Sequence, residues 1–131
     1  MILDSSFLLD LTHEQEAAIA KATEIEQANA PIHIPAVAVY ELYYGVEYLD
    51  KGRDERERLN RVFDRHPIVA PGRAIMHKSA QIDAHLDSSG QALDDLADVM
   101  IGATGSVRGE PVLTRNADHF ERMPDVDVST Y

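Results

Sequence analysis

Four acidic side chains interrupt otherwise apolar stretches of the chain. Asp4 follows the apolar start Met-Ile-Leu, Glu41 lies inside AVAVYELYYG, Asp98 lies inside LADVMIGATG, and Asp118 follows TRNA. A buried acid among apolar residues tends to be paired or bound to metal. Carboxylates gathered at one place repel one another, and a divalent cation keeps them ionised. The four acidic residues together predict a Mg²⁺ or Mn²⁺ site that could hold a phosphodiester and activate a bound water.

Each of these side chains also has a purely structural explanation. Asp4 could cap the helix that follows it, and Glu41 and Asp98 could face solvent. Asn116 could be a turn residue, and Asp118 an acid favoured at a helix N-terminus. The coincidence of all of them favours a shared site.

Asp94 and Asp95 precede Asp98 by about one helical turn, so either could share its face. Acids at the start of a helix also stabilise the helix dipole. We expect the capping role, with Asp95 the better candidate to support the site.

The apolar pattern predicts the elements that position these residues. Strands are expected at 1–3, 32–35, 67–71, 111–114 and 125–128, and helices at 12–30, 36–49, 53–64, 73–86, 93–109 and 117–123. Thr12 and Gln15 resemble a capping box, and Gly109 is expected to close its helix. The alternation predicts one α/β domain over residues 1–131, with a central, mostly parallel sheet. The working site of such a sheet lies at the carboxyl ends of its strands.

The amino-acid composition excludes several kinds of metal site and binding mode. The chain has no Cys, which excludes disulfides and thiolate metal sites, and its six His show no zinc-site spacing. A net charge of -11 argues against holding nucleic acid by bulk electrostatics, but not through metal ions and a local Arg. The acidic, Lys-poor composition suggests a halophilic source. With no signal peptide or long apolar run apparent, we expect a cytoplasmic protein without membrane contact.

Four stretches together resemble a known family: MILDSSFLLDL, PAVAVYELYYG, LADVMIGATG and VLTRNADHFERMPDVDV. Their order and spacing are similar to those of PIN-domain proteins, and more narrowly of the VapC toxins of type II toxin–antitoxin systems. The resemblance covers nearly the whole chain. It implies a three-layer α/β/α PIN fold with the acidic site at the carboxyl edge of the sheet.

The resemblance also implies roles for individual residues. Asp4, Glu41, Asp98, Asn116 and Asp118 would form the catalytic pocket. Of these, Asp4, Asp98 and Asp118 would bind the metal, and Glu41 would bind a second cation or orient the attacking water.

Three positions depart from the family pattern. Asn116 stands where many members carry Asp, which removes one charge. Gly102 stands where Ala is commoner, which affects packing. His119 stands where some members carry an acid, so the resemblance leaves open which residue after Asn116 reaches the metal.

Several other residues near these motifs could support the catalytic pocket or contact the substrate. Ser6 and Thr114 could hydrogen-bond the acids or a phosphate. Arg115 could contact the RNA backbone, although we favour an outward surface position. The tyrosines within 40–48 are expected in the core or an interface, with base stacking the alternative. Asp10 is expected to be an ordinary surface acid.

The activity that the resemblance implies is a Mg²⁺- or Mn²⁺-dependent endoribonuclease, the toxin of a toxin–antitoxin pair. Its partners would be an RNA substrate, a cognate antitoxin whose tail fills the acidic pocket, and a second copy of the chain, with residues 36–64 at the dimer interface. The alternatives are a PIN-domain nuclease of RNA processing and a PIN-like module that has lost catalysis. A haloacid-dehalogenase phosphatase would need Asp where Ser6 stands.

Overall fold

The computed structural model describes residues 1–131 as seven helices and five short strands. The helices are α1 Ser5–Thr12, α2 Glu16–Gln27, α3 Ala36–Tyr48, α4 Gly52–Phe63, α5 Arg73–Ser88, α6 Leu96–Arg108 and α7 Ala117–Phe120. The strands are β1 Ile2–Leu3, β2 Ile34–Pro35, β3 Ile68–Val69, β4 Val112–Leu113 and β5 Val128–Ser129. No helix is both long enough and apolar enough to cross a membrane.

All strand pairs are parallel. One sheet has the order β1-β4-β5, a second pairs β2 with β3, and a bridge between Ile2 and His33 joins the two. The resulting order across the molecule is β3-β2-β1-β4-β5. The central strand β1 is completely covered, and it delivers the chain to the carboxyl edge of the sheet immediately before Asp4.

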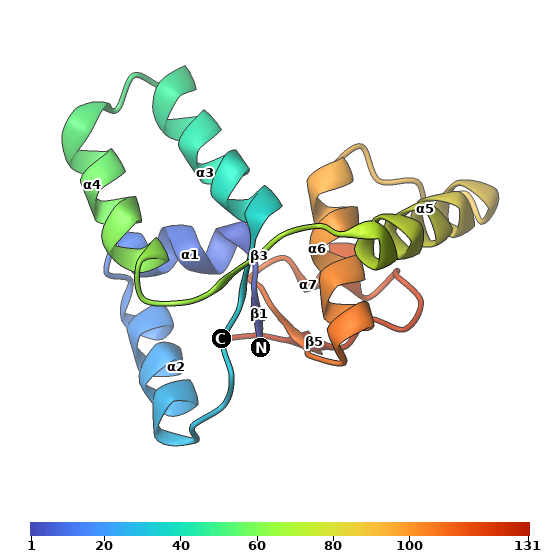
Figure 1. The fold of residues 1–131 in the computed structure, drawn as a ribbon, viewed down its shortest axis with the longest axis horizontal. Helices are drawn as coiled ribbons and strands as arrows, with labels where there is room; N and C mark the ends of the chain where they lie inside the picture. Colours follow the sequence, from blue (N-terminus) through green and yellow to red (C-terminus); the bar gives the residue numbers. More distant parts are fainter.

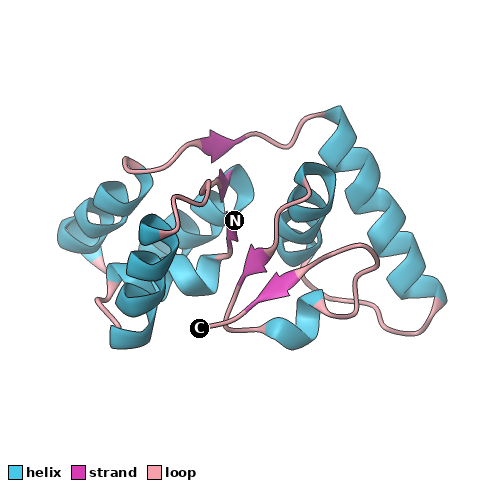
Figure 2. Cartoon of the chain, turned by 90° about the horizontal axis from the view of Figure 1, so that it is seen from below, coloured by secondary structure: helices cyan, strands magenta, loops and turns pink.

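Helices flank the strands on both sides, as Figures 1 and 2 show. Helices α1, α2 and α4 lie on one side, and α5, α6 and α7 lie on the other. Phe7 and Leu8 from α1 and Ile101 from α6 are at most 1% exposed, so apolar faces from both helical layers pack on the sheet. The predicted three-layer α/β/α architecture with a parallel sheet is confirmed.

The first helical region differs from the prediction. The helix expected over 12–30 is present as α2 but begins only at Glu16: the chain forms α1 directly after β1, breaks at Glu14 with φ 54°, and resumes as α2. The Thr12 hydroxyl donates to the Leu8 carbonyl inside α1, and Gln15 makes no side-chain cap bond. The apolar run after Asp4 is therefore helix α1, the helix that Asp4 was considered to cap, for which the pattern analysis gave no bounds.

Small residues bring α6 close to β4. A Cβ at Gly105 would lie 2.9 Å from the Glu110 carbonyl oxygen and 2.9 Å from Val112 Cγ2. The helix ends as predicted at Gly109, whose φ of 65° suits glycine. It begins at Leu96, three residues later than predicted. This close approach of α6 to the sheet fixes Asp98, in the first turn of α6, near the end of β1.

Candidate active site

Asp4 lies at the carboxyl end of β1 and is 1% exposed. Its Oδ2 accepts hydrogen bonds from Ser6 Oγ at 2.5 Å and Thr114 Oγ1 at 2.7 Å, and a longer one from the Ser6 amide at 3.4 Å. Its Oδ1 has only the Ser5 hydroxyl, at 3.4 Å. Asp4 is therefore the N-cap of α1, and it also keeps one carboxylate oxygen nearly free beside the other acids.

The turn after β4 is tied to the same carboxylate. The Thr114 hydroxyl accepts from the Asn116 amide at 2.9 Å, and the Ser6 hydroxyl accepts from the Arg115 amide at 3.1 Å. These bonds join α1 to the end of β4 around Asp4. The sequence could only suggest the Thr114–Asp4 and Arg115–Ser6 contacts, because these partners lie more than 100 residues apart in the chain.

Asp98 is 8% exposed, and its Oδ2 lies 2.6 Å from His119 Nδ1. Burial raises the pKa of Asp98, and the charges of Asp4 and Asp95 act in the same direction. The hydrogen bond to His119 opposes this rise. No hydrogen bond engages the other oxygen, Oδ1.

Glu41, on α3, has the most perturbed carboxyl group of the site. Burial, followed by the charges of Asp95, Asp4 and Asp98, raises the pKa of Glu41 to about 7. The Ser5 hydroxyl acts in the opposite direction. Glu41 Oε2 is buried without any hydrogen-bond partner. An unsatisfied buried carboxylate oxygen is costly, and neighbouring acids increase the cost.

Asp95 has two effects. As N-cap of α6, it accepts a hydrogen bond from the Ala97 amide at 2.9 Å, which is the expected capping role. Its charge also contributes to the raised pKa values of Glu41 and Asp98. Asp94 is exposed and makes no hydrogen bond, so it caps nothing.

Among the residues after β4, the side chain that contacts Asp98 is not one of the two expected in the catalytic pocket. The side chains of Asn116 and Asp118 are exposed and form no hydrogen bonds. His119, next in the chain, is the residue whose side chain contacts Asp98. The structure thus brings Asp4, Glu41, Asp98 and His119 together and leaves Asp118 at the surface.

Asp10 is not an ordinary surface acid, so this prediction is wrong. Its side chain is 13% exposed, and both oxygens accept from Arg115 Nη1, at 2.7 and 2.8 Å. The Tyr131 hydroxyl donates to the same carboxylate at 2.7 Å. Arg115 does reach the surface, with 56% of its side chain exposed, but this pair fixes it in place. No local pattern could have revealed partners more than 100 residues away.

A cleft of about 340 Å³ opens beside the acids, between α1, α3 and α4. Apolar side chains of α3 and α4 line one part of it, among them Leu42, Val46 and Leu59. Its polar lining consists of Ser5, Ser6, Glu41, Lys51, Glu55, Arg115 and Asn116. Glu41 therefore contributes to the wall of an accessible cavity.

These residues suit a hard divalent cation, although no three His, Asp or Glu side chains are close enough together to hold an ion as they stand. Asp4 Oδ1, Asp98 Oδ1 and Glu41 Oε2 are the oxygens with weak or no partners. Oxygen donors are the ligands that Mg²⁺ and Mn²⁺ prefer. A cation beside Asp4 and Asp98 would also offset their repulsion on Glu41, which adds to the larger effect of burial on its pKa.

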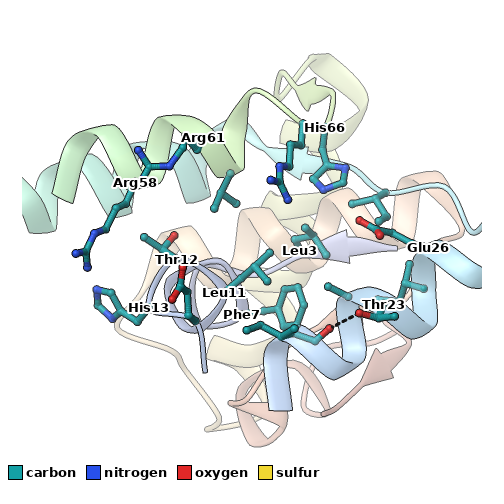
Figure 3. A pocket seen from close by; sticks show the side chains of 17 residues that line it. Leu3, Phe7, Leu11, Thr12, His13, Thr23, Glu26, Arg58, Arg61 and His66 are labelled. Atoms are coloured by element: carbon teal, nitrogen blue, oxygen red, sulfur yellow. Dashed lines mark hydrogen bonds between the residues drawn. The ribbon is translucent and has the colours of Figure 1, made fainter. Parts of the chain in front are cut away.

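A second, larger cavity of about 550 Å³ lies between α1, α2 and α4. Figure 3 shows its floor, with Leu3, Phe7 and Leu11, and an upper wall with Arg61 and His66. Arg58 and Arg65 also line it. Burial lowers the pKa of His66, so the arginines carry the positive charge of this wall at neutral pH.

Three tyrosines form a ridge on the outside of α3. Tyr40, Tyr44 and Tyr48 are 65%, 55% and 74% exposed, and their rings stack with centroids 6.1 and 5.7 Å apart. Tyr43 instead packs edge-on against Phe63. Only Tyr43 of these four contacts the core.

The chain is an α/β/α domain with acidic side chains from β1, α3 and α6 near the carboxyl edge of its parallel sheet. Residues 1–126 match the PIN domain family, so the chain belongs to that family. PIN domains are generally nucleases. A sequence search among curated proteins found no relative.

Solved structures with the same fold include several toxin–antitoxin complexes. VapBC2 from Rickettsia felis, bound to a DNA fragment from its promoter, superposes with a TM-score of 0.88 at 18% identity, over 99% of this chain and 97% of that one. DNA-bound VapBC from Salmonella typhimurium gives 0.80 at 22%, over 98% and 96%. FitAcB from Neisseria gonorrhoeae gives 0.77 at 25%, over 97% and 94%. These neighbours share the fold of this chain over nearly its whole length.

Proposed function

We propose that this PIN domain is the toxin of a type II toxin–antitoxin pair and hydrolyses RNA phosphodiesters with Mg²⁺ or Mn²⁺. The observation that carries the proposal is the raised pKa of Glu41, to about 7, with an unpartnered buried Oε2 beside Asp4 and Asp98. Such a perturbed carboxyl group in a cleft is typical of catalytic sites.

The chain's own groups have distinct tasks in this reaction. Asp4 and Asp98 would hold the cation, which supplies an activated water and stabilises the charge that develops on the phosphate. Ser6 and Thr114 hold Asp4 Oδ2, so Oδ1 stays oriented toward the site. Glu41 Oε2 accepts the proton of the attacking water, because burial, the largest cause of its raised pKa, keeps this carboxyl group a stronger base than an exposed one.

Cleavage of RNA by the purified protein tests this proposal. We expect cleavage with Mg²⁺ or Mn²⁺, none with EDTA, and a loss of at least about 100-fold for Asp4→Asn or Asp98→Asn without loss of folding. Asp94→Asn is the matched control and should keep full activity. Cleavage that survives EDTA contradicts the metal mechanism, and full activity of Asp98→Asn contradicts the site. Because the composition suggests a halophilic source, each assay is run at low and high salt.

An antitoxin segment fits the cavity between α1, α2 and α4. Its apolar floor and its arginines Arg58, Arg61 and Arg65, which outnumber the acids Glu14 and Glu26 of the lining, suit an amphipathic segment that carries acidic residues on one face. The test measures binding of the protein encoded by a small neighbouring gene. Arg61→Glu should weaken binding at least about tenfold, whereas Arg53→Glu, on the same helix but outside the cavity, should not. Equal binding by both variants contradicts this docking site, and the lack of any such partner favours an RNA-processing nuclease.

The tyrosine ridge Tyr40, Tyr44 and Tyr48 supports the expected homodimer, because exposed aromatic side chains on one helix face commonly mark an interface. Light scattering after size exclusion should give a dimer for the unaltered chain and a monomer for Tyr44→Glu. A monomeric unaltered chain contradicts the dimer.

A further inference from the structure

Arg115 is fixed in place beside the acidic site, where it lines the cleft together with Ser6 and Glu41. Its main chain is held because the Arg115 amide donates to the Ser6 hydroxyl at 3.1 Å, and this hydroxyl donates in turn to the Asp4 carboxylate. Its side chain is held because Nη1 donates to both carboxylate oxygens of Asp10, at 2.7 and 2.8 Å. Arg115 therefore keeps a defined position relative to the acids of the site.

Asp10, the partner of Arg115, is itself held by the core. It lies on α1 with its side chain 13% exposed, and it also accepts a hydrogen bond from the Tyr131 hydroxyl at 2.7 Å. The ring of Tyr131 packs edge-on against Phe7, which is 1% exposed. Contacts thus run from the core through Tyr131 and Asp10 to the guanidinium. Fixing a long side chain before a ligand arrives reduces the entropy that is lost on binding.

These contacts leave one edge of the guanidinium group free. Nε and Nη2 of Arg115 make no hydrogen bond, and 56% of the side chain is exposed. The two nitrogens carry parallel N–H groups, the fork with which arginine binds two oxygens of one phosphate. A free fork on an arginine that is already fixed is suited to binding an oxyanion.

The charge of the cleft gives this arginine a task. Only Lys51 and Arg115 are basic among the residues that line the cleft, in a chain with a net charge of -11. Lys51 is exposed and forms no ion pair or hydrogen bond, so no contact fixes its ammonium group. The acids of the site repel a polyanion, and a cation held close to them offsets part of that repulsion.

We propose that Arg115 binds a backbone phosphate of the RNA through Nε and Nη2, and that Asp10 is the residue that positions it. The inference rests on the proposed function and adds to it one substrate-binding residue. Contacts to phosphate fix the register and orientation of a nucleic acid but carry no base information. Arg115 therefore contributes affinity for RNA and places the strand at the cleft without selecting its sequence.

The salt dependence of RNA binding tests this contact without measuring cleavage. The probe is fluorescein-labelled decauridine, whose anisotropy is titrated over a series of KCl concentrations at constant Mg²⁺. Every protein carries Asp98→Asn, which the proposed function makes inactive. Arg115→Gln should weaken binding at least about tenfold at low salt, and it should reduce the slope of log K against log salt by about 0.7, the value for one phosphate contact on a single strand. Arg73→Gln, which alters an exposed arginine of α5 outside the cleft, should change neither.

Asp10→Asn separates phosphate binding from a purely structural role of the ion pair. Both Asp10→Asn and Arg115→Gln break the pair and should lower the Tm, but Asp10→Asn keeps the cation and should keep the full salt slope. A slope unchanged in Arg115→Gln, an equal loss of slope in both variants, or no binding of the probe with Arg115 present overturns this inference and leaves the proposed function standing. Cleavage of the probe in the Asp98→Asn background contradicts the proposed role of Asp98 and not the phosphate contact. Circular dichroism checks that each variant is folded.

Discussion

Replacing Glu41 by Gln should make the metal-free protein more stable at neutral and alkaline pH. Burial and three neighbouring acids raise the pKa of Glu41 from 4.5 to about 7, so the ionised carboxylate opposes folding. Below pH 4.5 the group is protonated in both states and costs nothing. Between about pH 4.5 and 7 the unfolded chain releases the proton while the folded chain keeps it, so the free energy of unfolding falls with rising pH. Above pH 7 the full cost is present.

The size of the effect follows from the same values. A rise from 4.5 to about 7 sets an upper limit of about 3 kcal/mol. The side chain is only half-buried, and solvent screening reduces the expected gain of Glu41→Gln to about 1–2 kcal/mol. For a domain of this size the gain corresponds to a rise in Tm of about 3–8 °C.

Thermal unfolding followed by circular dichroism, with EDTA, provides the assay. The Tm of Glu41→Gln should be higher than that of the unaltered chain at pH 8, and the two Tm values should converge near pH 4.5. Glu47→Gln, a control on the exposed face of the same helix, should change stability by less than about 0.5 kcal/mol. A Glu41→Gln protein that is no more stable at pH 8, or equally favoured at both pH values, refutes the argument that Glu41 is buried among acids.

Three further outcomes are expected. Gly105→Ala should lower the free energy of unfolding by about 2–3 kcal/mol, because the new Cβ would meet a backbone carbonyl. Gly102→Ala should lower it by only about 1 kcal/mol, because the new Cβ would meet a flexible methionine side chain. Urea titrations of the two variants measure this difference in stability. Thr114→Val removes a hydrogen bond to Asp4 and should weaken Mn²⁺ binding about tenfold by calorimetry, and unchanged affinity would contradict its orienting role. Adding Mn²⁺ at 100 times its Kd to EDTA-free apoprotein should stabilise it by about 2.7 kcal/mol, and an unchanged Tm would argue against ion binding.

The parallel sheet, and the edge of it at which the polar residues lie, could be predicted because both depend on short local sequence patterns. Short apolar strands ending at Asp4 and Thr114 predict a parallel sheet with polar residues at its carboxyl edge. Asp4 was weighed as either the cap of the first helix or a ligand. The structure shows that its Oδ2 serves the helix and the hydroxyl groups while Oδ1 stays free for the site. The two roles do not compete.

The remaining site contacts depend on distance in space, which pattern analysis does not reach. The Arg115–Asp10 pair and its tyrosine partner Tyr131 span the whole chain. Whether Asp118 or His119 faces Asp98 depends on the orientation of the four-residue helix α7 against α6. The burial of Phe120 sets this orientation, and the order of the polar residues does not. The halophilic source also stays a prediction.

The tyrosine ridge on α3 has an optical consequence. The chain contains five tyrosines and no tryptophan, so its intrinsic ultraviolet emission comes from tyrosine alone. Tyr131 donates to the carboxylate of Asp10, a contact that quenches tyrosine emission, while the three ridge rings are exposed. Helix α3 therefore carries a natural fluorophore, and its emission reports, without any label, whether another molecule covers that helix.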